Sequence, residues 1–134
     1  MMGALGSRSA VTLDLDQDGD LDIVTNELFG RPQLLLSNLS LKRALHAISI
    51  RLRGTRSNRQ GIGARVTVVL PDGRRILKQM DGKSGYLSQS DLPLYFGLGD
   101  ADQAARIEVV WPSGRRQSIP GPHPAGRAVE VVER

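Results

Sequence analysis

Five aspartates occupy alternate positions within nine residues near the start of the chain: Asp14, Asp16, Asp18, Asp20 and Asp22. Neighbouring carboxylates repel one another by about 1 kcal/mol per close pair even in water. Calcium takes about six to eight oxygen ligands in irregular geometry, so it turns this repulsion into binding. The order D-x-D-x-D-G-x-x-D supplies side-chain oxygens, a sharp turn at Gly19 and a backbone carbonyl at Asp20. We therefore predict that the five aspartates bind Ca²⁺. A solvated acidic turn without metal is the alternative.

The residues around this loop indicate its class. An EF-hand would need a bidentate Glu at the twelfth position, which here is Thr25. The flanking apolar residues form short runs that are typical of strands, with Val11 and Leu13 before the loop and Ile23 and Val24 after it. The loop is therefore predicted to join two β-strands.

A second polar stretch, residues 84–91, could bind a carbohydrate or protein ligand. It combines an amphipathic aromatic with two hydroxyls, an amide and a carboxylate: Tyr86, Ser88, Gln89, Ser90 and Asp91. The alternative is that these side chains bond nearby backbone and only shape the loop. A carbohydrate-active or hydrolytic domain that uses this loop is an alternative function. A Ser-His-Asp arrangement with Ser88, Ser90 and Asp91 would need a histidine base, however, and His46 and His123 lie in flanking segments. We therefore predict no catalytic residues.

Arginines gather in the middle of the chain, at Arg51, Arg53, Arg56, Arg59 and Arg65. Strand alternation places the first two on one side of the segment 48–53. Such a face suits phosphate or a sulfated glycan, so a polyanion binder is one alternative function. A plain solvated face is the other reading. Nucleic-acid binding is not expected, because no aromatic residue is interleaved with these arginines for base stacking.

The elements that carry these residues are predicted to be short strands. The chain has 134 residues, with Gly 15 and Pro 7 punctuating β-branched runs, which favours an all-β fold. Expected strands in the second part are 48–53, 66–70, 75–80, 94–96, 107–111, 115–119 and 128–132. Their number and spacing predict a compact antiparallel β-sandwich or barrel.

The charged residues are unevenly distributed along the chain. Residues 1–41 hold two basic and six acidic residues, and residues 42–134 hold sixteen basic and eight acidic residues.

The first part resembles a known repeat. Asp14 to Asp22, followed by Ile23–Asn26 and Gly30–Asn38, is similar to an FG-GAP (VCBS-type) repeat. The resemblance implies a partial β-propeller blade, a hairpin with a calcium loop, over residues 1–41. One copy is present, and a single blade cannot bury both its faces. We therefore expect it to pack on the second domain, to self-associate, or to pack on missing propeller blades of a longer protein.

The second part resembles the ASPIC/UnbV domain in four separate blocks: Ser57–Val66, Gly85–Asp91, Phe96–Gly99 and Trp111–Gly114. This resemblance implies a β domain over residues 42–134. That domain usually stands at the C-terminal end of exported proteins built from FG-GAP repeats. The combination implies a binding or scaffold role outside the cytoplasm.

These observations lead to one expected function. We predict a non-enzymatic, calcium-binding module for binding or adhesion, extracellular, periplasmic or at the cell surface in its parent protein. The start of the chain shows no signal peptide, and no apolar run is long enough for a membrane span. The chain contains no cysteine, so the presence or absence of disulfide bonds gives no indication of its cellular compartment.

Overall fold

A computed structural model describes residues 6–42, 44–83, 85–90 and 93–134. As predicted, the fold is all-β, and the described residues contain no helix. The strands are β1 (Ser7–Leu13), β2 (Asp22–Glu27), β3 (Gln33–Leu35), β4 (Ala47–Arg53), β5 (Arg65–Val69), β6 (Arg75–Gln79), β7 (Leu94–Gly97), β8 (Gln103–Val110), β9 (Arg116–Pro124) and β10 (Ala128–Val132).

The chain divides into two compact units, which are best described separately. Unit 1 comprises Met1–Leu45 and Gly82–Asp91, and unit 2 comprises His46–Asp81 and Leu92–Arg134. The segment Gly82–Asp91 therefore belongs to unit 1, whereas the expected division at residue 41 leaves it in the second domain. Sequence pattern could not assign this segment, because its contacts are with residues far from it along the chain.

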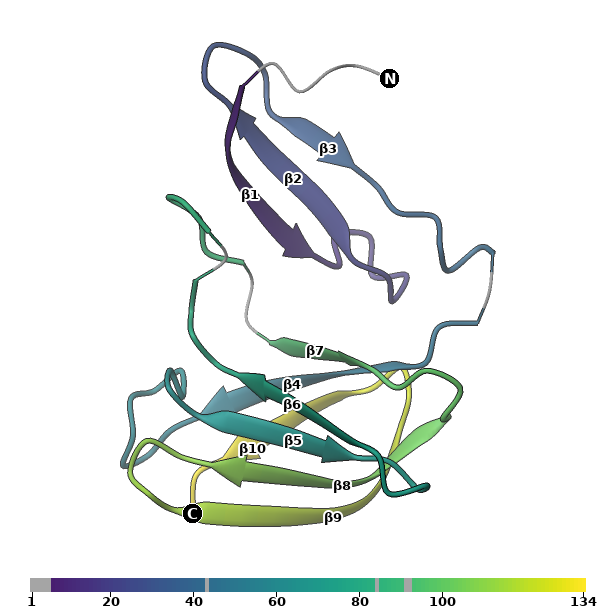
Figure 1. The fold of residues 1–134 in the computed structure, drawn as a ribbon, viewed down its shortest axis with the longest axis vertical. Helices are drawn as coiled ribbons and strands as arrows, with labels where there is room; N and C mark the ends of the chain where they lie inside the picture. The colour runs from purple at the N-terminus through teal and green to yellow at the C-terminus, as the bar shows by residue number, and fades with distance from the viewer. Residues whose placement is uncertain (1–5, 43, 84, 91–92) are drawn as a thin grey trace. The chain divides into compact units, whose positions relative to one another are not determined.

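Unit 1 contains one antiparallel sheet, in the order β1-β2-β3 (Figure 1). The aspartate loop connects β1 to β2, and the last paired residues before it are Leu13 and Asp22. Residue Val24 of β2 pairs with Val11 of β1 and with Leu34 of β3. The two strands flanking the loop therefore form as predicted, and their pairing fixes both ends of the loop.

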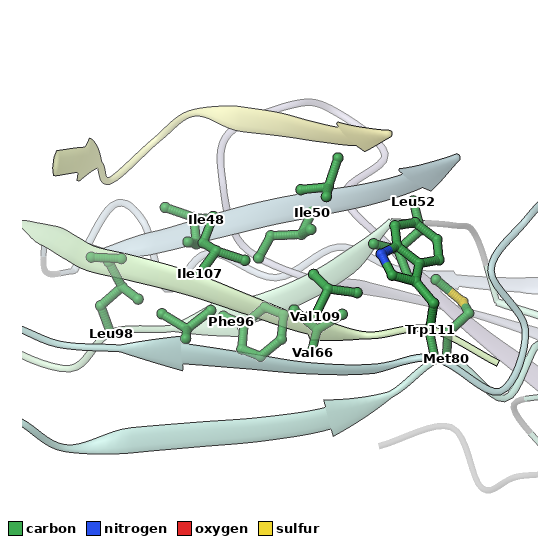
Figure 2. Close-up of a cluster of buried hydrophobic side chains, with 14 of the residues drawn as sticks. Ile48, Ile50, Leu52, Val66, Met80, Phe96, Leu98, Ile107, Val109 and Trp111 are labelled. Carbon is green, nitrogen blue, oxygen red and sulfur yellow. The ribbon is translucent and has the colours of Figure 1, made fainter. Parts of the chain in front are cut away.

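Unit 2 is a sandwich of two sheets, ordered β10-β4-β7 and β6-β5-β8-β9. Figure 2 shows side chains from both sheets meeting in the layer between them. Residues that are at most 2% exposed include Ile50 of β4, Phe96 of β7, Val66 of β5 and Ile107 of β8. Trp111, which follows β8, packs in the same core with its ring 2% exposed. This confirms the predicted sandwich.

Strand β4 shows how the sequence forms this core. Its residues alternate between the core and the outer face, so Ile50 and Leu52 are buried while Arg51 and Arg53 are exposed. Period-two alternation of this kind is what a strand with one buried face requires. The neighbouring sheet uses the same rule at Val66 and Val68 of β5.

Two hairpins of the second sheet use the same turn. Gly73 N–H donates to the Leu70 carbonyl at 3.0 Å, and Gly114 N–H donates to the Trp111 carbonyl at 2.9 Å. Both glycines lie in the left-handed region, with φ of 88° and 85°. A residue with a Cβ is disfavoured there, so the Pro-Asp-Gly and Pro-Ser-Gly sequences suit these turns.

One strand pairing differs from the prediction of a wholly antiparallel sandwich. Strand β10 pairs with β4 in parallel, with Glu130 opposite Arg51 and Val131 opposite Leu52. Parallel neighbours need a crossover connection. Here the connection from β4 to β10 contains all the other strands of unit 2: β7 of the same sheet, and β5, β6, β8 and β9 of the opposite sheet. No local sequence pattern signals this pairing.

The described part of the chain has no helix with the length and apolar character needed to cross a membrane.

Candidate metal centre and polar surfaces

The aspartate loop gathers three carboxylates at one point. One oxygen from each of Asp14, Asp16 and Asp18 lies within 4.8 Å of the others. Asp14 directly follows β1 and is partly buried, whereas Asp16 and Asp18 are exposed. Gly19 makes the sharp turn with φ of 91°. The predicted spacing therefore brings these three side chains together.

Asp20 and Asp22 have a different environment, because the protein itself bonds their carboxylates. Asp22 is 1% exposed, and its two oxygens accept hydrogen bonds from Leu15 N at 2.9 Å and Ser37 N at 2.8 Å. One oxygen of Asp20 accepts from Ser40 N at 2.9 Å. These bonds join the loop to the segment that follows β3.

Hydrogen bonds within the loop fix its shape further. Asp18 N donates to Asp16 Oδ1 at 3.3 Å, and Asp20 N donates to Asp18 Oδ1 at 3.0 Å. The Ser40 hydroxyl donates to Asp18 Oδ2. The loop thus has an ordered set of internal bonds that leaves other carboxylate oxygens available.

The electrostatics of the loop reflect the crowding of its carboxylates. Desolvation and the negative charges of Asp18 and Asp22 raise the pKa of Asp16, although the N–H of Asp18 opposes this. The bond from the Ser40 N–H chiefly lowers the pKa of Asp20, against its desolvation. A cation among these side chains would relieve the repulsion.

Two carboxylate oxygens support a metal more directly. Asp14 Oδ1 and Asp20 Oδ1 are inaccessible to solvent and have no hydrogen-bond partner in the described structure. Burying an unpaired carboxylate oxygen is costly, and native proteins rarely do so without a partner. Oxygen-only donors of this kind fit a hard cation such as calcium. The residues present therefore fit the predicted ion.

Within the predicted ligand loop over residues 84–91, the described residues 85–88 form a tight reversal in unit 1. Gly85 and Ser88 make an isolated bridge, and between them Tyr86 and Leu87 are 67% and 80% exposed. Ser90 Oγ accepts a hydrogen bond from Thr12 N of β1 at 3.1 Å. Ser90 therefore contacts the edge of β1, and the aromatic tip is left facing solvent.

Two of the remaining predicted residues of that loop, Ser88 and Gln89, lie in the described part of the structure. Ser88 Oγ has no hydrogen-bond partner among the described residues, so no histidine of that part of the chain bonds it. Gln89 is exposed. Asp91 lies outside the described residues.

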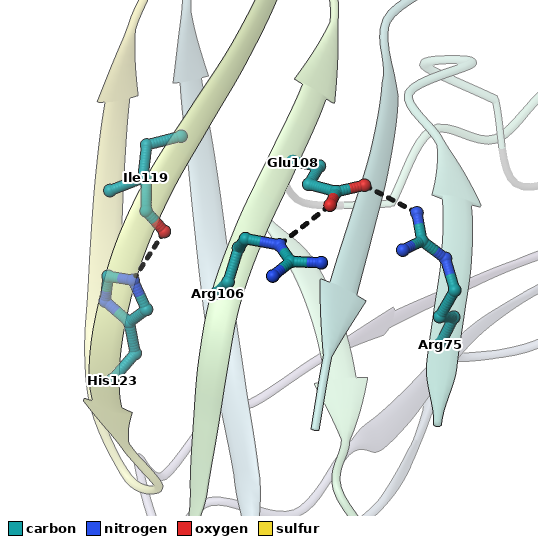
Figure 3. A network of polar contacts seen from close by, with 5 residues as sticks. All are labelled: Arg75, Arg106, Glu108, Ile119 and His123. Carbon is teal, nitrogen blue, oxygen red and sulfur yellow. Dashed lines mark hydrogen bonds and ion pairs between the residues drawn. The ribbon is translucent and has the colours of Figure 1, made fainter. Parts of the chain in front are cut away.

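The arginine face separates into two groups. Arg51, Arg53 and Arg59 line one cavity of unit 2, whereas Arg56 and Arg65 do not line it. Figure 3 shows a different arrangement on the second sheet, where Glu108 accepts from Arg75 at 2.5 Å and from Arg106 at 2.8 Å. On that sheet, Arg75 and Arg106 therefore share one carboxylate.

Sequence reasoning missed two buried carboxylates, Glu27 and Glu133, and Glu133 is the more buried at 2% exposed. Its carboxylate accepts from three consecutive backbone N–H groups, those of Thr55, Arg56 and Ser57, at 2.7–2.9 Å. The Ser113 hydroxyl donates to it at 2.5 Å. Burial acts to raise the pKa of Glu133, but these bonds outweigh it and hold that pKa well below its usual range. The one signal available was an acidic residue directly after the apolar strand β10.

Comparison with known proteins covers most of the chain. A family model described as ASPIC and UnbV matches residues 54–134. Cartilage acidic protein 1 of Xenopus tropicalis is 34% identical over 113 residues, which cover 82% of this chain and 17% of that protein. The Mus musculus protein of the same name is 33% identical over 112 residues, with 81% and 17% covered. The chain thus spans about a sixth of the length of these curated relatives. Since the family model matches more than half of its residues, the chain belongs to the ASPIC and UnbV family.

Proposed function

We propose that this chain is a non-enzymatic binding or adhesion module that a calcium ion in unit 1 stabilises. The observation that carries the proposal is the aspartate loop. Three carboxylates meet within 4.8 Å there, and two buried carboxylate oxygens lack any hydrogen bond in the described structure. On this proposal, unit 1 is a partial FG-GAP-type blade of a larger protein.

The five aspartates would have two roles, as ligands of the ion and as residues that hold the loop in place. Asp14, Asp16 and Asp18 would supply side-chain oxygens, and Asp20 would add its backbone carbonyl and its unbonded Oδ1. Asp22, the fifth predicted ligand, is 1% exposed and bonds backbone with both oxygens, so its first role would be to hold the loop in place. Both oxygens of the exposed Asp18 also accept bonds, from Asp20 N and the Ser40 hydroxyl, so Asp18 would bind the ion through its remaining lone pairs. A bound ion would supply positive charge that reduces the repulsion among these carboxylates.

The location of the parent protein is part of the proposal. The relatives are named for cartilage, a tissue whose matrix lies outside cells. Free calcium outside cells is abundant enough to fill a weak, solvent-open site with a dissociation constant on the order of 10⁻⁴ to 10⁻³ M. We therefore propose an extracytoplasmic protein in which calcium occupies the loop permanently and does not act as a signal.

Amide hydrogen exchange tests the proposal. Millimolar calcium should slow exchange in residues 14–22 and at Ser37 and Ser40, whose N–H groups bond the loop. Asp16→Ala should remove this protection, and Gln17→Ala should retain it because that side chain is not a predicted ligand. Equal exchange with calcium and with chelator in the unsubstituted chain would contradict the proposal.

A further inference from the structure

We infer that unit 2 carries a pocket for an anionic oligosaccharide, one that presents sulfate or carboxylate groups together with hydroxyls. The pocket is a cavity of about 510 Å³. This falls within the size range of small-ligand sites, roughly 300–1,000 Å³. It lies entirely in unit 2, so the inference holds whether or not the loop of unit 1 binds calcium.

Three arginines from two segments line the cavity. Strand alternation in β4 places Arg51 and Arg53 on its outer face, and Arg59 comes from the connection between β4 and β5. Buried Leu52 and Met80 form the apolar part of the lining. An apolar base weakens the local screening of charge, so an anion held there interacts more strongly with the arginines than it would in open solvent.

The segment that carries Arg59 is held at several points. Gly54 N donates to the Arg59 carbonyl at 3.0 Å, and the Asn58 side chain makes two bonds of 2.7 Å with the Ile62 backbone. The buried carboxylate of Glu133 accepts hydrogen bonds from the N–H groups of residues 55–57, which precede Arg59 in the same connection. This bonding holds the backbone of Arg59 beside β4 before any ligand arrives, which lowers the entropy that binding must overcome.

The charges of these arginines are not satisfied internally. Three other arginines of unit 2 are paired, Arg74 with Asp72 and both Arg75 and Arg106 with Glu108 (Figure 3). Within the described residues, no carboxylate lies at ion-pair distance from Arg51, Arg53 or Arg59. Guanidinium groups bind planar and tetrahedral oxyanions through paired N–H donors, so an external sulfate or carboxylate matches them.

The rest of the lining indicates why the ligand is a saccharide. Glu130 lies opposite Arg51 in the β4–β10 register and also lines the cavity, beside the Gln60 amide. A carboxylate repels a uniform polyanion but accepts hydrogen bonds from sugar hydroxyls. The lining contains no aromatic ring on which a nucleobase could stack. A sugar carrying both anionic groups and hydroxyls satisfies every polar residue of the pocket.

The test is a titration of the full chain with a heparin-derived hexasaccharide in 50 mM NaCl with chelator present. We expect saturable binding. Arg53→Ala and Arg59→Ala should each weaken it about tenfold, the loss of one charge-assisted bond. Arg116→Ala is the matched control, because it removes the same charge from an exposed residue of β9 outside the pocket, and binding should stay within about twofold. A second titration with a desulfated hexasaccharide that retains its carboxylates shows whether the sulfate or the carboxylate groups carry the binding.

Several results would overturn the inference. Absence of saturable binding to both hexasaccharides would do so. Equal weakening by Arg116→Ala and Arg59→Ala would show attraction to net charge alone. A neutral dextran, or single-stranded DNA of matched length, that bound as tightly as the hexasaccharide would show that the pocket does not select an anionic saccharide.

Discussion

Replacing Asp22 by alanine separates the structural aspartates of the loop from its proposed ligands. The Asp22 side chain is 1% exposed and accepts bonds from Leu15 N and Ser37 N. Removing it leaves two backbone donors unpaired, at about 1–3 kcal/mol each. Leu15 is 45% exposed, so water can reach that part of the loop and reduce the cost. We therefore expect Asp22→Ala to destabilise the metal-free unit 1 by about 2–4 kcal/mol.

Asp16→Ala should behave in the opposite way without calcium. Asp16 is exposed, and the charges of Asp18 and Asp22 act against its ionised form. Its removal relieves repulsion, so the metal-free unit should keep its stability or gain slightly. With calcium, the same substitution should abolish the stabilisation by metal, because one proposed ligand is lost.

The assay is amide exchange in chelator, read separately for each unit. Amides of β2 and β3 report the stability of unit 1, and those of β4 and β5 in unit 2 serve as an internal reference that neither substitution should change. Unchanged protection in β2 and β3 of Asp22→Ala would refute this reasoning. So would a loss in metal-free Asp16→Ala as large as that in Asp22→Ala.

Three further predictions concern other parts of the chain. Gly61→Ala should lower the free energy of unfolding of unit 2 by about 2–5 kcal/mol, because φ is 69° and the new Cβ would lie 2.9 Å from Leu52. Gly73→Ala has φ of 88° but open space around the new Cβ, so it should cost only about 1–2 kcal/mol. Thermal denaturation of the two variants measures both losses. Because the pKa of Glu133 is lower in the folded chain than its ordinary value of 4.5, its ionised carboxylate stabilises the fold at pH values above 4.5, and this contribution is lost as the pH falls toward the folded pKa. In acid denaturation, the free energy of unfolding of Glu133→Gln should therefore depend less steeply on pH, by up to one proton. An unchanged pH dependence would contradict this. Leu34, Leu35 and Leu36 are each about half exposed at edge strand β3, so light scattering should detect association that rises with concentration, and a monomer throughout would refute it.

Local pattern predicted the elements that depend on local physics. Alternation identified β4 because Ile48, Ile50 and Leu52 must share one face of a strand. The turn at residues 71–74 also follows from local sequence, because it needs a left-handed residue and Gly73 supplies one with φ of 88°. The parallel pairing of β10 with β4 and the placement of residues 82–91 in unit 1 depend on contacts between distant segments, which periodicity does not contain.

The candidate sites show the same limit. Spacing predicted that Asp14, Asp16 and Asp18 could share an ion, since alternate positions in a tight loop point inward together. It could not show that Asp22 bonds Ser37, a backbone donor fifteen residues further on. The sequence grouped Arg51, Arg53 and Arg59 in one basic run, but it could not show that these three line one cavity, because Arg59 joins Arg51 and Arg53 only through the fold of the connection between β4 and β5.

Calorimetric titration of the chain with calcium tests the central claim most directly. We predict binding of one ion in unit 1 with a dissociation constant on the order of 10⁻⁴ to 10⁻³ M, and poor substitution by magnesium, which requires tighter octahedral geometry. At a hundredfold excess over that constant, calcium should stabilise the folded loop by about 2.7 kcal/mol. Asp18→Ala should abolish the binding heat, and Gln17→Ala should retain it. No heat of binding at millimolar calcium in the unsubstituted chain would mean that the five aspartates form a solvated turn and not a metal site.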